Sequence, residues 1–206
     1  MNMGEHRISI EESTHQFLLA SLFGSEYREQ KVDDLEIAIH RAYRDFCRTI
    51  RDKNNPEIKK LDETKKAAEE IIKKYINELL DCNVQINYDA WHEKLCRKIV
   101  DENKYTYGQA QKWVNMTMKY LVVLDYKNVR DFIPQLHVPI DSDIINKLEV
   151  LGIITDDNKT PLIPWSSIQI NPENDNIYTQ LQVDIRNSEK IKPNPFEWEF
   201  SVWNTK

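Results

Sequence analysis

Apolar residues recur every three or four positions along most of the first 133 residues, and no other feature of the sequence constrains the fold as strongly. Segments 33–52 and 61–80 each carry one clear apolar stripe, and segments 11–23 and 87–100 carry shorter ones. In 107–124, apolar residues cover most of the helical circumference. This spacing predicts a set of amphipathic helices, with 107–124 buried on most of its sides.

The last 73 residues have a different composition, because seven of the eight prolines, from Pro134 onward, fall within them. Short helices are expected at 141–151 and 174–187, with loops and extended chain elsewhere. In 196–202, the residues Phe196, Trp198, Phe200 and Val202 alternate with polar side chains. This period of two predicts a strand or an extended tail that lies on the helical body.

The sequence therefore predicts a mainly α-helical fold, a compact multi-helix single domain with an irregular C-terminal third. Residues 1–133 are expected to form the helical core, and 134–206 to pack on it. A chain of 206 residues with 40% hydrophobic and 30% charged residues is long enough to bury such a core. No apolar run reaches the roughly 20 residues that a membrane span needs, and the N-terminus lacks a secretory-signal pattern. A soluble, cytoplasmic protein is expected.

The patterns of cysteine, histidine and glycine exclude several kinds of site. Three widely spaced cysteines fit neither a disulfide framework nor a metal knuckle, and they indicate a reducing compartment. None of the five histidines lies at H-x-x-x-H spacing from another, so no metal site is expected. The four glycines form no phosphate-binding loop, so nucleotide-cofactor enzymes are excluded and no cofactor is expected.

A row of basic residues lies opposite the apolar stripe of 33–52. This arginine row consists of Arg41, Arg44, Arg48 and Arg51. It could bind phosphate groups or a protein partner. Asp45 and Asp52 each follow an arginine by four residues, and such helical ion pairs would instead leave an ordinary solvated face. The net charge of −6 argues against non-specific attraction to phosphate, but it is compatible with a local basic face.

The expected helix 107–124 also carries a polar stripe. It contains Gly108, Lys112, Asn115 and Lys119. Because its flanks are apolar, the stripe must face either solvent or a cleft. A lysine amine in a partly desolvated cleft can act as a nucleophile. The alternative is a pair of lysines that extend their ammonium groups into water.

Downstream, the string His-Val-Pro-Ile-Asp-Ser runs from His137 to Ser142. Asp141 precedes the apolar residues of the expected helix 141–151, which is the position of an N-cap. A carboxylate fixed at a helix N-terminus could also stabilise a developing positive charge. Capping alone would be sufficient to explain Asp141.

Together these segments resemble the helix–hairpin–helix DNA glycosylase superfamily, in which a Val-Pro-Val-Asp-type segment carries the catalytic aspartate and a lysine opens an upstream helix. Gln111-Lys112, with 29 positions to Asp141, is most similar to the archaeal 8-oxoguanine DNA glycosylase branch. The resemblance implies that Lys112 attacks the sugar C1′ of a flipped nucleotide and forms a Schiff base, while Asp141 stabilises the cationic sugar. Trp113 or Trp165 would stack on the extruded base.

Further candidate binding residues around this pair are Gly108, Gln111, Asn115, Lys119, His137 and Trp165. The superfamily's Leu-Pro-Gly-x-Gly turn, whose backbone amides bind a DNA phosphate, corresponds here to 104–108. This stretch holds one glycine and no proline.

Two functions stay open at this point. One is a DNA glycosylase and lyase that acts through Lys112 and Asp141. The other is a non-catalytic helical module that binds a protein or nucleic acid through the arginine row or the C-terminal aromatic residues. Those aromatic residues, with Trp165, could stack on single-stranded nucleic acid, or pack in the core or against a partner.

Overall fold

The computed structural model describes residues 9–30, 32–50, 58–82, 85–103, 105–155, 164–169 and 177–204. Within these ranges all regular structure is helical and no strand occurs, so the expected mainly α-helical fold is confirmed. No helix in the described part of the chain combines the length and the hydropathy that crossing a membrane requires.

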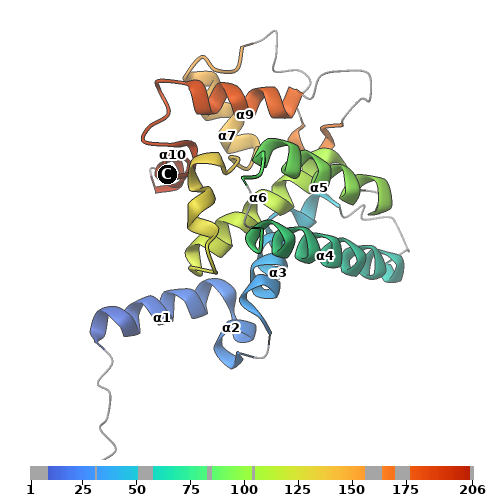
Figure 1. The fold of residues 1–206 in the computed structure, drawn as a ribbon, viewed down its shortest axis with the longest axis vertical. Helices are drawn as coiled ribbons and strands as arrows, with labels where there is room; N and C mark the ends of the chain where they lie inside the picture. The colour runs from blue at the N-terminus through green and yellow to red at the C-terminus, as the bar shows by residue number, and fades with distance from the viewer. Residues whose placement is uncertain are drawn as a thin grey trace, which may run out of the picture.

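The elements follow one another along the chain as α-helices and short 3-10 helices. They are α1 (Ile10–Phe23), α2 (Ser25–Glu29), α3 (Asp34–Phe46), η1 (Cys47–Thr49), α4 (Ile58–Leu80), α5 (Tyr88–Asn103), α6 (Tyr107–Val123), η2 (Val129–Gln135), α7 (Ser142–Val150), η4 (Trp165–Ser167), α9 (Ile177–Asn187) and α10 (Pro195–Asn204). In Figure 1, α7, α9 and α10 gather at one end of the molecule, and α1 and α2 lie at the other.

Helix α6 lies at the centre of this arrangement, where α3, α5, η2 and η4 pack against it (Figure 1). Every residue from Tyr107 to Met118 is buried, which confirms the burial that the sequence predicts. The indole Nε1 of Trp113 donates to the carbonyl of Ile39 in α3 over 3.0 Å. The positions of the surrounding helices are therefore set largely by their contacts with α6.

The start of α6 is fixed by contacts with its own residues and with η4. Thr106 and Gln109 form a reciprocal capping box, in which each side chain accepts from the other residue's backbone amide over 3.1 Å. The Thr106 hydroxyl donates to the carbonyl of Ser166 over 2.5 Å, and the amide of Gly108 donates to the carbonyl of Ile168 over 3.0 Å. These contacts hold η4 directly on the first turn of α6.

The expected strand or extended tail at 196–202 is wrong, because this segment belongs to helix α10. Trp198 and Val202 are buried, and they lie four residues apart as one face of a helix requires. Asn194 accepts from the amide of the third helical residue over 3.0 Å, and Pro195 occupies the first helical position. The helix-start signal at these two residues outweighs the alternation that follows it.

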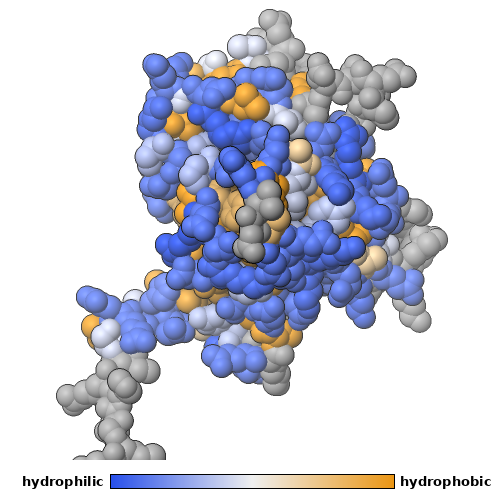
Figure 2. Space-filling model, viewed as in Figure 1, coloured by the Kyte–Doolittle hydropathy of each residue, from blue (hydrophilic) through white to orange (hydrophobic). Residues whose placement is uncertain are grey.

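Helix α1 is less buried than its sequence suggests. Phe17 and Leu18 are 69% and 58% exposed, whereas Leu19 and Phe23 are buried. The helix extends away from the rest of the body (Figure 1), and only its last turns reach the core. Figure 2 shows that the face viewed there is mostly hydrophilic, with hydrophobic residues in small scattered groups.

Gly108 provides a test of the contact between α6 and η4. A Cβ added at this position would lie 1.8 Å from the carbonyl oxygen of Trp165. Within a helix, replacing glycine by alanine normally stabilises the fold by about 1 kcal/mol. We expect Gly108→Ala to have the opposite sign and to lower the free energy of unfolding by about 1–3 kcal/mol, measured by urea denaturation.

Gly24→Ala provides a comparison without a collision, since nothing lies within 4 Å of its added Cβ. Its backbone, with φ 82° and ψ −152°, lies in a region that only glycine adopts readily, so its expected loss of about 1–3 kcal/mol comes from backbone strain alone. A Gly108→Ala protein as stable as the wild type would contradict the close packing of η4 on α6.

Candidate functional site

Lys112 and Asp141 form an ion pair that is almost enclosed by the protein. The ammonium Nζ donates to Asp141 Oδ2 over 2.6 Å, and the two side chains are 6% and 14% exposed. Lys112 lies in the second turn of α6, and Asp141 lies immediately before α7. The structure therefore brings together the two residues that the sequence analysis singled out.

Asp141 uses its two carboxylate oxygens for different contacts. Oδ1 accepts from the backbone amide of Ile144 over 3.0 Å, which confirms the expected N-cap of α7. Oδ2 accepts from Lys112. The N-terminal dipole of α7 and the ammonium both attract this carboxylate. Capping thus holds the carboxylate in place while its second oxygen stays against the amine.

Two buried glutamine side chains hold the segment that leads to Asp141. Gln111 donates to the carbonyl of Ile140 over 2.8 Å and accepts from its amide over 3.1 Å. Gln182 of α9 makes the same pair of contacts with Val138, over 2.8 and 3.0 Å. A primary amide offers a donor and an acceptor side by side, so each glutamine satisfies both polar groups of one backbone residue.

Asn115 lies at the centre of a buried polar network beside this segment. Its Nδ2 donates to Gln111 Oε1 over 3.0 Å and to the hydroxyl of Tyr178 over 2.7 Å. Its Oδ1 lies 2.8 Å from Nε2 of His92, and the hydroxyl of Tyr178 lies 3.1 Å from Nδ1 of His137. The network connects α5, α6, α9 and the 136–141 segment.

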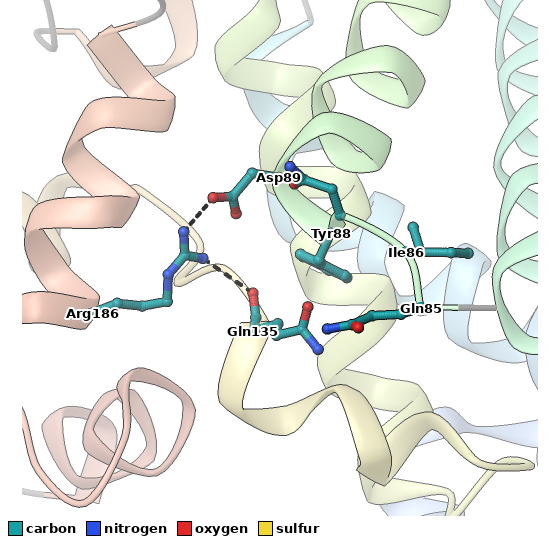
Figure 3. A pocket seen from close by; sticks show the side chains of 7 residues that line it. Gln85, Ile86, Tyr88, Asp89, Gln135 and Arg186 are labelled. Atoms are coloured by element: carbon teal, nitrogen blue, oxygen red, sulfur yellow. Dashed lines mark hydrogen bonds and ion pairs between the residues drawn. The ribbon is translucent and has the colours of Figure 1, made fainter.

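At His137 the network reaches a cavity of about 540 Å³, which lies between the start of α5, η2 and α9. Figure 3 shows Arg186 between Asp89 and the carbonyl of Gln135. His137 Nε2 lies 2.7 Å from Asp89 Oδ1. Burial alone would raise the pKa of Asp89, but hydrogen bonds from His137 and Arg186 hold it well below its ordinary value of 3.8.

Lys112 and Asp141 line a different and larger cavity, which has a volume of about 740 Å³. It is lined by Arg41, Arg44, Asp45, Arg48, Lys112, Met116, Lys119, Tyr120, Asp141, Ser142, Asp143, Trp165, Phe200, Trp203 and Asn204. Segments from α3, α6, α7, η4 and α10 thus converge on one hollow. We call it the lysine cavity.

Several of the predicted binding residues do not line the lysine cavity. Gly108, Gln111, Asn115 and His137 are buried and contact the protein's own groups. Trp113 does not line the cavity either, and its indole is fully buried against α3. Of the two tryptophans expected to stack on a base, only Trp165 lines the cavity. Arg51 lies outside the described residues.

Lys119 and Glu199 form a second ion pair beside the lysine cavity, with 11% and 2% of their side chains exposed. The Lys119 ammonium lies 4.2 Å from the ring centroid of Phe200, and the Trp203 indole donates to Glu199 Oε1 over 2.6 Å. Burial lowers the pKa of Lys119 from its ordinary value of 10.5, although Glu199 opposes this shift. The sequence pattern did not identify Glu199, because its side chain is directed inward only when residues 195–204 form the helix α10.

The arginine row divides into two kinds of residue. Arg41 pairs with Asp45 over 2.5 Å, as the four-residue spacing predicts. The other oxygen of Asp45 accepts from the hydroxyl of Tyr120 over 2.7 Å. Arg44 and Arg48 are exposed at the edge of the lysine cavity. The row is therefore only partly neutralised by neighbouring carboxylates.

Within the described part of the chain, no group of three His, Cys, Asp or Glu side chains is arranged to hold a metal ion. Cys47, Cys82 and Cys96 are free thiols. Comparisons of the chain with protein-family models, with curated proteins and with solved structures yield no match.

The buried histidines predict a pH-dependent stability. Burial lowers the pKa of both His92 and His137 below the ordinary value of 6.5. Below that pH the unfolded chain binds more protons than the folded chain, so the free energy of unfolding falls as pH decreases. We expect a loss from pH 7 to pH 5 of up to about 1.4 kcal/mol per pH unit for each histidine, measured by urea denaturation.

His92→Gln removes one of these groups and retains an amide that can bond to Asn115. The variant should therefore lose less stability than the wild type over the same pH interval. Equal pH dependence of the two proteins would contradict a neutral, buried His92.

Proposed function

We propose that the protein is a DNA glycosylase with lyase activity, which excises a modified base from a flipped nucleotide in the lysine cavity. The observation that carries the proposal is the contact of 2.6 Å between the Lys112 amine and the Asp141 carboxylate at this cavity. Lys112 acts as the nucleophile, and Asp141 stabilises positive charge on the sugar.

The covalent steps use these two residues, the nucleotide and water. Asp141 takes one proton from the Lys112 ammonium, and the free amine Nζ forms a bond to C1′ while the glycosidic bond breaks; the base leaves with the bonding electrons and takes up the proton that Nζ loses on forming this bond. The sugar ring then opens, its oxygen takes the proton held by Asp141, and C1′ becomes a protonated Schiff base with Nζ, whose positive charge the Asp141 carboxylate stabilises. Asp141 takes a C2′ proton as the 3′ phosphate leaves, and water hydrolyses the Schiff base to release Lys112.

The size and lining of the lysine cavity support a nucleotide as its occupant. A volume of about 740 Å³ lies within the range of about 300–1,000 Å³ that small-molecule sites occupy. Trp165, Phe200 and Trp203 provide aromatic surfaces on which a base can stack. Lys119 and Glu199 add a donor and an acceptor next to those rings.

A purely structural role explains the Lys112–Asp141 pair less well. Removing two charges from water is costly, and replacing a buried ion pair by well-packed apolar residues often leaves stability unchanged or raises it. Charged pairs retained at a cavity are therefore candidates for chemistry. Lys112 belongs to α6, whose residues are almost all buried, and its side chain nevertheless lines the cavity.

Trapping with borohydride tests the proposal. The protein is incubated with oligonucleotides that carry 8-oxoguanine, uracil or an abasic site, and reduction converts a Schiff base into a stable adduct. We expect an adduct on Lys112, identified by gel shift and mass spectrometry, and none with Lys112→Gln. Lys74→Gln, which removes an exposed lysine of α4, is the control and should trap as the wild type does.

A wild-type protein that forms no adduct with any of these substrates would overturn the lyase proposal. Binding to the same oligonucleotides without an adduct would instead favour the non-catalytic nucleic-acid-binding module. A melting curve of Lys112→Gln shows whether an absent adduct reflects lost chemistry or an unfolded protein.

Asp141→Asn separates the capping contact of this residue from its charge. Asparagine is as good an N-cap as aspartate, so α7 should keep its start. The variant leaves the buried Lys112 ammonium without its carboxylate, so we expect it to be less stable than the wild type, and its rate is measured below its melting temperature. Loss of the carboxylate should lower the single-turnover rate of base release by about 10²–10³-fold. A wild-type rate in Asp141→Asn would show that the charge of Asp141 plays no part in the reaction.

A further inference from the structure

The lysine cavity is lined by five cationic side chains and three carboxylates. The cations are Arg41, Arg44, Arg48, Lys112 and Lys119, and the carboxylates are Asp45, Asp141 and Asp143. Three of its cations are already paired, as Lys112–Asp141, Lys119–Glu199 and Arg41–Asp45. The side chains of Arg44 and Arg48 make no ion pair or hydrogen bond with any residue that the structure describes. Both are exposed and both line the cavity. Two guanidinium groups therefore remain available to an incoming ligand.

One alternative site for an anion, the start of α6, is already used by the protein's own groups. Backbone amides at the first turn of a helix commonly bind phosphate. At the start of α6, however, the amides of Thr106 and Gln109 are used by the capping box, and the amide of Gly108 donates to Ile168. This helix end therefore offers few free donors to a phosphate.

Arg48 is held at a defined place relative to the lysine cavity. Its neighbour Thr49 accepts at its hydroxyl from Gln109 Nε2 over 3.3 Å, and the same hydroxyl donates to the carbonyl of Phe46 over 2.8 Å. These bonds attach η1 to the first turn of α6, which is the helix that carries Lys112. Arg44 precedes it by one turn on α3.

We propose that Arg44 and Arg48 bind the phosphodiester backbone of the DNA strand whose nucleotide enters the lysine cavity. This inference rests on the proposed glycosylase function. The planar guanidinium, with five donors, matches the oxygens of a phosphate better than any other side chain does. Because the chain carries a net charge of −6, attraction to DNA depends on such local contacts rather than on overall charge.

The salt dependence of DNA binding tests the inference independently of catalysis. The probe is a fluorescein-labelled duplex with one tetrahydrofuran abasic-site analogue, which binds without forming a Schiff base. Fluorescence anisotropy gives the Kd at several salt concentrations. Each phosphate contact contributes about 0.9 to the slope of log K against log salt. Arg44→Gln and Arg48→Gln should each lower the slope by about 0.9, and the double variant by about 1.8.

The matched control is Arg28→Gln, which removes one positive charge from an exposed arginine of α2 that does not line the lysine cavity. This variant should keep the wild-type slope. Melting temperatures of the arginine variants should match the wild type, since Arg44 and Arg48 are exposed. A double variant with the wild-type slope, or a wild-type protein that does not bind the duplex, overturns the inference.

Borohydride trapping of the same variants separates this inference from the proposed function. An adduct at Lys112 combined with an unchanged salt slope leaves the glycosylase proposal intact and refutes the role of Arg44 and Arg48. A reduced slope without any adduct retains the phosphate contact and refutes the Schiff-base mechanism at Lys112.

Discussion

The candidate site depends on the contact between Lys112 and Asp141, two charged groups that the fold brings almost completely out of water. Such a pair is stable only where the surrounding geometry is accurate and the remaining polar atoms are satisfied. Here the carboxylate also caps α7, and Gln111 binds both polar backbone groups of Ile140. The surrounding network thus maintains a contact that burial would otherwise oppose.

Much of the helical body could be predicted because its signals are local. Helix α6 has more apolar residues than one apolar face of a helix can hold, so the sequence predicts that it is buried on most sides. The cap at Asp141 could be predicted in the same way, since proline and aspartate before an apolar run are signals of a helix start. The prediction that Lys112 lies close to Asp141 rested instead on the resemblance of two short segments to helix–hairpin–helix DNA glycosylases.

The helical form of α10 and the roles of Glu199 and Gln182 were not predicted. They depend on an ambiguous spacing of apolar residues or on contacts between distant segments. In α10, the alternation of Trp198 and Val202 with polar residues fits a period of two, but the two are also one helical turn apart. Once the helix forms, Glu199 turns inward toward Lys119, a partner 80 residues earlier. Gln182 likewise reaches Val138 across 44 residues, and no local pattern distinguishes it from a solvent-facing glutamine.

Gln111 and Lys112 are consecutive residues of α6, and this adjacency has a mechanical consequence. Any displacement of the helix moves the amine and the amide that holds the carboxylate segment by the same amount. The distance between the two charged groups therefore depends on α6 and on the segment that it holds, and not on the projecting α1. Changes in segments that do not contact either of these are expected to leave that distance unchanged.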